Sequence, residues 1–139
     1  MPIHSMGKFA EAKAILKKAI DKKPDYSDAN LNYAFVFHQE KNLPEEVKLL
    51  EDLIKKAPNY LPAYKNIGIS LVDLGLWQRA IEFWQKAATI EPNGSYEYNI
   101  GIAYAQHNDI PKAREWHIKA AQKGDGNAKK ILEHNGVKY

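Results

Sequence analysis

The sequence contains no cysteine, which excludes disulfide bonds, thiolate metal sites and cysteine nucleophiles. It also lacks any apolar run approaching the roughly 18 residues that a membrane-spanning helix needs. The first residues, MPIHSMGKFAEAK, contain no apolar segment typical of a secretory signal and lead directly into a charged helical pattern. We therefore expect a cytoplasmic chain without direct membrane insertion.

Motifs that carry catalysis or hold cofactors are missing too. The five histidines show neither an HExxH motif nor a pair four residues apart, so no metal site is expected. Gly124 and Gly126 flank an aspartate, and the Lys-Ser/Thr pair of a phosphate-binding loop does not follow them. Adjacent acidic residues such as Glu45 and Glu46 point in different directions around a helix. We expect no enzymatic activity and no cofactor.

The composition is that of one soluble folded domain. Of the 139 residues, 45% are hydrophobic and 27% are charged, which is ordinary for a globular protein. The net charge is +3, and the lysines occur as scattered pairs such as Lys22-Lys23 and Lys55-Lys56. These two pairs fall where helices are expected to end, and cations there offset the helix dipole. The charge pattern therefore does not indicate a nucleic-acid partner.

Proline recurs at a fixed spacing. Pro24, Pro58 and Pro92 are 34 residues apart, and 34 is the length of a tetratricopeptide (TPR) repeat. Residues 59–92 resemble the TPR pattern at nearly every signature position: Tyr64, Ile67, Gly68, Leu71, Gly75, Ala80, Trp84, Ala87 and Pro92. This resemblance implies an all-α fold, a right-handed α-solenoid of antiparallel helix pairs (the TPR superhelix). It also implies a protein-binding role.

The period divides the chain into repeats, each with a first helix (A) and a second helix (B). We expect one TPR domain over residues 1–139, with an unpaired B helix over 7–24, repeats over 25–58, 59–92 and 93–125, and a C-terminal capping helix over 126–135. An A helix before residue 7 is not found, so the chain is either a fragment of a longer array or has a bare end. Glu46 departs from the pattern, because the other B helices have alanine there.

The last repeat has its own features. The run KAREWHIKAAQKGDGNAKK resembles the related Sel1-like repeat in the spacing of its alanines and of Trp116. Its B helix is expected to direct Trp116 and Ala120 inward. His117 takes the position of Trp84 and is expected to be a packed histidine rather than a metal ligand.

A peptide-binding surface is expected on the A helices, which line the concave side in TPR proteins. Asn32, Asn66 and Asn99 take equivalent positions and resemble the asparagine ladder in the TPR superhelix of O-linked N-acetylglucosamine transferases. A carboxamide can pair with both the N–H and the C=O of an extended peptide. Equally, these residues could be tolerated on a helix face or bond between adjacent helices. The neighbouring rows complete the candidate site: Leu31, Lys65, Tyr98, Phe35, Ile69 and Ile102.

The lining of this groove favours an apolar peptide or an amphipathic helix. The cations of the TPR clamp that binds two carboxylates are absent, since Leu31 and Phe35 replace the Lys and Asn of its first repeat. We therefore expect a non-catalytic protein-interaction module. Two alternatives remain open: a scaffold that self-assembles as a homo-oligomer, and a targeting domain of a larger enzyme. Self-assembly would use the uncapped N-terminal helix through Phe9, Ile15, Leu16 and Ile20.

Overall fold

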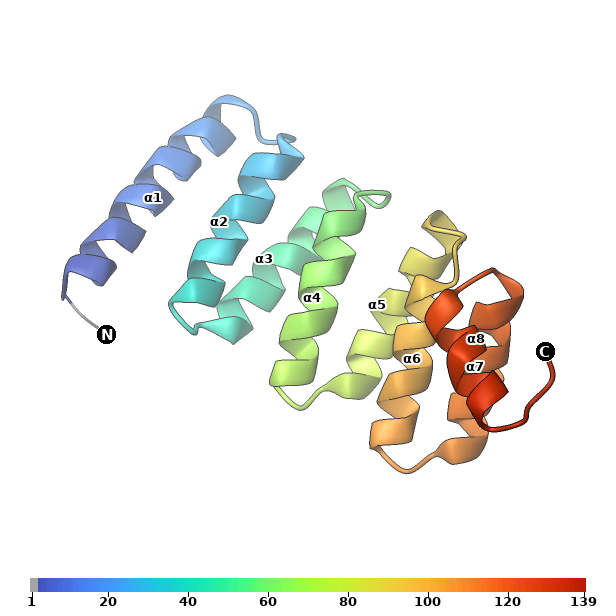
Figure 1. Ribbon diagram of the computed structural model, residues 1–139. Coiled ribbons are helices and arrows are strands. Elements are labelled where there is room, and N and C mark those ends of the chain that lie inside the picture. Colours follow the sequence, from blue (N-terminus) through green and yellow to red (C-terminus); the bar gives the residue numbers. More distant parts are fainter. Residues whose placement is uncertain (1–2) are drawn as a thin grey trace. The chain divides into compact units, whose positions relative to one another are not determined.

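The computed structural model describes residues 3–139, and their side chains from residue 6 onward. These residues form eight α-helices and no strand (Figure 1). The helices are α1 (Ile3–Lys22), α2 (Ser27–Gln39), α3 (Leu43–Lys56), α4 (Leu61–Asp73), α5 (Trp77–Ile90), α6 (Ser95–Gln106), α7 (Ile110–Gln122) and α8 (Gly126–His134). The expected all-α class of successive helix pairs is confirmed.

Two compact units divide the chain, Met1–Gly75 (unit 1) and Leu76–Tyr139 (unit 2). In unit 1, α2 contacts both α1 and α3, and α4 contacts α3 and α2. Neighbouring helices run antiparallel, and α3 passes behind α2 and α4 in Figure 1. In unit 2, α6 lies against α5 and α7, and α8 lies against α7. Helices that contact one another are thus mainly neighbours in the chain.

Each period-setting proline lies just after a B helix. Pro24 follows α1, Pro58 follows α3 and Pro92 follows α5, because proline lacks the N–H that would continue the helical hydrogen bonds. At Asp125, where the next proline would fall, the aspartate instead caps α8. Its carboxylate accepts a hydrogen bond from the backbone N–H of Ala128 at 2.9 Å.

The turns between A and B helices share a backbone conformation rather than a residue. Gly75 has φ +78°, and the equivalent residues Lys41 and Asn108 both have φ +63°. Left-handed φ values cost glycine least and lysine considerably more. The geometry of the turn therefore persists in two repeats that lack the favoured glycine.

The cores are built from the predicted apolar periodicity. In α3, the expected residues Val47, Leu50, Leu53 and Ile54 are all buried. In unit 2, Ala120, Ala121, Ala128 and Leu132 form a cluster between α7 and α8, and Tyr98, Ile118 and Val137 pack against it. We refer to it as the C-terminal cluster.

The last B helix is rotated relative to the expectation. His117 is buried, with 5% of its surface exposed, and burial lowers its pKa, against an opposing effect of Asp125. Its expected role as a packed histidine is confirmed. Trp116, expected to point inward, is instead only partly buried and lines a surface pocket. Adjacent residues differ by about 100° around a helix, so only one of the two can face the core.

The N-terminal helix is also longer than expected. It begins at Ile3 rather than at Gly7, so Gly7 lies inside α1. A contact between side chains fastens α1 to α2, because Lys13 lies 4.0 Å from the ring centroid of Phe37 and forms an ion pair with Glu40.

Candidate peptide-binding surface

Two neighbouring A helices of unit 1 carry exposed apolar side chains at equivalent positions. Phe35 of α2 is 43% exposed and Ile69 of α4 is 47% exposed, although both are large hydrophobic residues. The helices α2 and α4 contact each other. Leu31 is partly buried, and Lys65 is exposed. We call the surface formed by Leu31, Asn32, Phe35, Lys65, Asn66 and Ile69 the A-helix stripe.

The asparagine row has unused hydrogen-bonding capacity. Asn32 is exposed and Asn66 is partly buried in unit 1, and Asn99 is exposed on α6 in unit 2. Among the described residues, none forms a hydrogen bond with the side-chain amides of these three asparagines. An interhelical role for the amides is therefore not observed, and their donors and acceptors face solvent.

The equivalent residues of α6 are less accessible. Tyr98 is partly buried, because it packs against the C-terminal cluster and lies 5.7 Å from the ring centroid of His117. Ile102 is partly buried as well. In unit 2, Asn99 is thus the most accessible member of the predicted row.

A buried polar network lies next to the A-helix stripe in unit 1. Glu46 of α3 is only 1% exposed, and its Oε1 accepts a hydrogen bond from the hydroxyl of Ser70, which is fully buried on α4. The Nδ1 atom of His38 lies 3.1 Å from the same oxygen and 3.3 Å from Ser70 Oγ. Glu46 departs from the repeat pattern, and the structure gives its carboxylate two partners.

This network fixes how His38 meets its surroundings. A carboxylate only accepts hydrogen bonds, so Nδ1 of His38 carries the hydrogen that it shares with Glu46. The imidazole is stacked on Phe35, with ring centroids 5.4 Å apart and planes at 12°. His38 thus joins the exposed Phe35 to the buried carboxylate. Sequence reasoning did not include His38 in the site, and the signal available was the paired departure at Glu46 and Ser70.

The residues predicted for self-association lie on α1. Ile15 is 69% exposed, whereas Phe9, Leu16 and Ile20 are partly buried. Ile20 lines a small cavity of about 140 Å³ with residues of α2 and α3, including Tyr33 and Leu53. The face was expected to lack a neighbour, but much of it is covered by α2 and α3, and Ile15 is its most exposed member.

Two kinds of site are not found in the part of the chain that the structure describes. No group of three or more histidine, aspartate or glutamate side chains is placed to hold a metal ion. No helix there combines the length and the apolar character needed to cross a membrane.

Comparison with known proteins identifies the repeats. Residues 4–68 match the family model described as tetratricopeptide repeat. This chain contains tetratricopeptide repeats. No curated protein matches the sequence.

Solved TPR structures of the protein MamA have a similar fold. One, titled "Crystal structure of MamA", is 23% identical with a TM-score of 0.73, and the match covers 89% of this chain and 73% of that chain. Another, MamA 41-end from Desulfovibrio magneticus RS-1, is 21% identical with a TM-score of 0.67 and covers 87% of this chain and 69% of that one. At this level of identity the likeness concerns the fold.

The TPR signature positions behave as the repeat requires. Tyr64, Ile67 and Leu71 are buried on α4, and Ala80 and Trp84 are buried on α5. Exposed positions between them, such as Ile69, are then available for contacts outside the repeat. Tetratricopeptide repeats serve as protein-interaction modules, and this chain is of that general class.

Proposed function

We propose that this chain is a non-catalytic interaction module whose A-helix stripe binds an extended peptide or an amphipathic helix of a partner protein. The observation that carries the proposal is the pair Phe35 and Ile69, two large apolar side chains exposed at equivalent positions of contacting helices. An apolar pair flanked by amides suits a partner that is apolar on one side.

The chemistry divides between burial and hydrogen bonding. Each Å² of apolar surface that a partner covers contributes about 25 cal/mol before the costs of ordering are subtracted. The amides of Asn32 and Asn66, which have no intramolecular partner among the described residues, can bond the partner's backbone. Leu31 and Lys65 border this surface, and Tyr98, Asn99 and Ile102 of α6 provide the equivalent positions in the last repeat.

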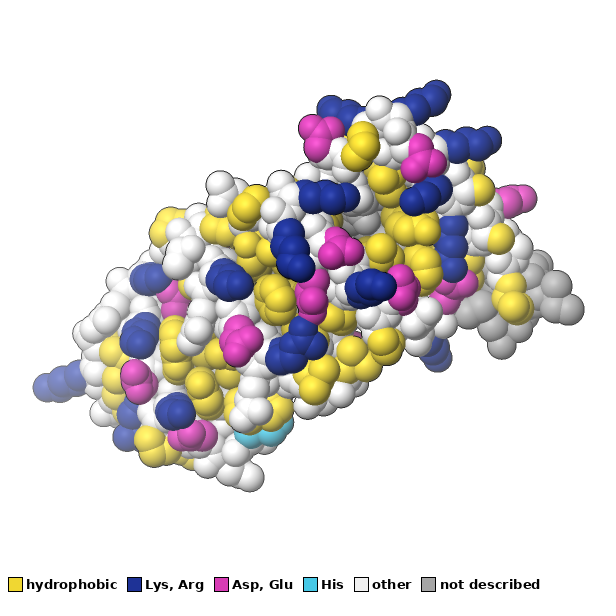
Figure 2. Space-filling model, turned by 180° about the vertical axis from the view of Figure 1, so that it is seen from behind, with side chains coloured by type: hydrophobic (Ala, Val, Ile, Leu, Met, Phe, Trp, Pro, Cys, Tyr) yellow, Lys and Arg dark blue, Asp and Glu magenta, His cyan; other side chains and the backbone are white. Residues whose placement is uncertain are grey.

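The charge distribution supports a protein partner rather than a nucleic acid. On the face seen in Figure 2, lysine and arginine side chains are interspersed with acidic ones, and hydrophobic side chains show between them. Binding to phosphates would be favoured by a continuous basic patch.

A peptide library tests the groove even while the natural partner is unidentified. Random peptides displayed on phage are selected on the immobilised protein, and the Kd of the best peptide is measured for the Phe35→Ala/Asn66→Ala variant. We expect Kd to rise at least tenfold, because an aromatic anchor and an amide are lost together. Ile15→Ala, which removes an exposed apolar side chain from α1, is the matched control. Unchanged binding by the double variant would place the site elsewhere.

Self-association through α1 is the second candidate, and the exposure of Ile15 favours it. Sedimentation velocity over a wide concentration range would show a dimer or larger species, and Ile15→Glu would convert it to monomer. Leu16→Glu should act in the same direction. A monomer at all concentrations, unaltered by Ile15→Glu, would eliminate this candidate. A role as the targeting domain of a larger enzyme is compatible with either mode of binding.

A further inference from the structure

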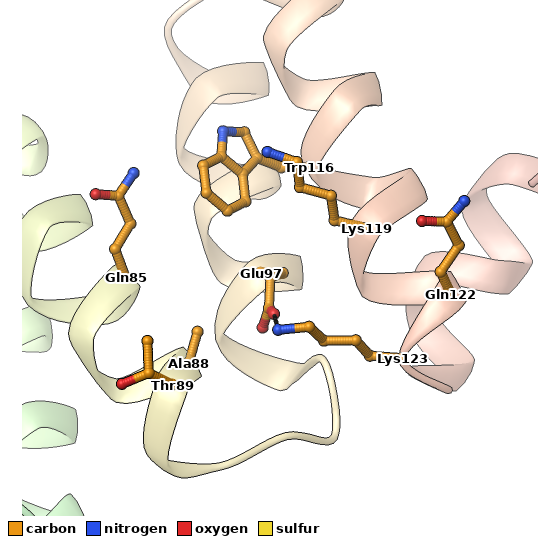
Figure 3. Close-up of a pocket in the computed structure, with 8 residues that line it drawn as sticks. All are labelled: Gln85, Ala88, Thr89, Glu97, Trp116, Lys119, Gln122 and Lys123. Atoms are coloured by element: carbon orange, nitrogen blue, oxygen red, sulfur yellow. Dashed lines mark ion pairs between the residues drawn. The ribbon is translucent and has the colours of Figure 1, made fainter.

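A pocket of about 280 Å³ opens in unit 2 between the B helices α5 and α7, with α6 contributing to its lining (Figure 3). Ala88 and Thr89 come from α5, Glu97 from α6, and Trp116, Lys119 and Lys123 from α7 and the residue that follows it. None of these residues belongs to the A-helix stripe. Small-molecule sites usually enclose about 300–1,000 Å³, so this pocket is suited to a single side chain rather than a large cofactor.

The decisive group in the pocket is a buried carboxylate. Glu97 is only 2% exposed, and its Oε2 forms an ion pair with the Nζ atom of Lys123, drawn as a dashed line in Figure 3. No described residue donates a hydrogen bond to Oε1, which is also buried. A buried acceptor without a donor is costly, so a ligand that supplies a donor gains more here than at the surface.

The charges of the pocket are already balanced. Lys123 pairs with Glu97, and Lys119 pairs with Glu115 at 3.5 Å while its Nζ lies 4.1 Å from the ring centroid of Trp116. A cationic ligand would compete with Lys123, and an anionic ligand would approach the buried carboxylate of Glu97. A neutral hydrogen-bond donor meets neither obstacle.

We propose that this pocket binds a tyrosine-like side chain of a partner protein. The phenol O–H donates to Oε1 of Glu97, and the ring packs against the indole of Trp116 beside Ala88. Aromatic anchors are enriched among the residues that dominate binding energy at protein interfaces, and arginine, the other common anchor, would add a third cation here. The pocket is thus a binding site separate from the A-helix stripe, and each can fail without the other.

Two-dimensional NMR with small aromatic probes tests the pocket directly. p-Cresol, toluene and 4-methylbenzylammonium are titrated into ¹⁵N-labelled protein, and the signals of the Trp116 indole N–H and of the Glu97 and Lys123 amides are followed. We expect p-cresol to shift these signals, and toluene and the cation to bind about tenfold more weakly, as the loss of a charge-assisted hydrogen bond predicts. Equal binding of p-cresol and toluene, tighter binding of the cation, or no shift at Trp116 would overturn the proposal.

Variants establish which groups act. Glu97→Gln should weaken p-cresol binding about tenfold, whereas Glu82→Gln, which changes an exposed carboxylate on α5, should leave it unchanged. Because Glu97→Gln also removes the charge that faces Lys123, Trp116→Leu provides a second test that alters only a partly exposed side chain. Full p-cresol binding by a folded Trp116→Leu protein would contradict the assignment.

Discussion

Gly101 of α6 lies directly against the imidazole of His117 on α7. A Cβ atom added at position 101 would lie 2.5 Å from Nε2 of His117, which is far inside van der Waals contact. The absence of a side chain at Gly101 therefore lets the buried histidine take the place that an aromatic residue has in the preceding repeat.

Gly101→Ala is expected to destabilise the protein even though alanine favours helices by about 1 kcal/mol. The clash with His117 should outweigh this gain and leave a net loss of about 1–3 kcal/mol, as in other overpacked cores. Urea denaturation measures the change, and Gly7→Ala is the control, because a Cβ there meets no atom within 4 Å. His117→Ala should relieve the clash in the double variant. If Gly101→Ala stabilised the protein as much as Gly7→Ala, the contact would be disproved.

Acid should weaken unit 2 through His117. Burial lowers the pKa of His117 from its usual 6.5, so the unfolded chain binds this proton more readily than the folded one. The stability due to neutral His117 is complete above about pH 6.5 and is lost progressively as the pH falls below it. The free energy of unfolding of His117→Leu, measured from pH 8 to pH 5, should fall less than that of the wild type. His134→Gln, at an exposed position, should follow the wild type.

Glu46→Ala should be destabilising although alanine is the residue of the other repeats. The substitution leaves Ser70 and His38 without their shared acceptor in a buried site, and such losses cost about 2–4 kcal/mol. Glu46→Gln, which keeps an acceptor, should cost less. Lys48→Ala, at an exposed position of the same helix, should change the free energy of unfolding by less than about 0.5 kcal/mol. An Ala variant as stable as the wild type would show that the network contributes nothing.

Tyr60 should ionise only at very alkaline pH. Burial, together with the hydrogen bond that its hydroxyl donates to Asp28, raises the pKa of Tyr60 from 10.0 to about 12. Because the folded state keeps this proton more tightly, the associated stability is present below about pH 10 and is lost as the pH rises toward 12. NMR of protein carrying ¹³Cζ-tyrosine would follow this titration. Asp28→Asn should lower the pKa of Tyr60, and an unchanged value would leave burial as the sole cause.

The helix ends were predictable because proline and apolar periodicity act locally. The last helix was expected to end near Asn135-Gly136, and α8 does end at His134. The rotation of a helix is harder to predict when two large residues adjoin. Trp116 and His117 both suit a core, and only the neighbouring helix, with Gly101 against His117, decides between them.

The A-helix stripe was predictable in position but not in its support. Alignment of the repeats placed Phe35 and Ile69 at equivalent positions, since the repeat period fixes which residues share a face. The partners of Glu46 lie on two other helices, and the sequence separation of Ser70 and His38 gives no sign of their proximity. The pocket around Glu97 was missed for the same reason, because its lining comes from three helices.

The neighbour-to-neighbour contacts of the helices also bear on how the chain folds. Nearly every contact within a unit joins helices that are adjacent in sequence, so forming it closes only a short loop. Helical proteins with such local contacts fold within microseconds to milliseconds, faster than proteins that depend on distant strand pairing. Each unit can therefore bury its apolar faces soon after its helices emerge in synthesis, which shortens the time during which they are open to aggregation.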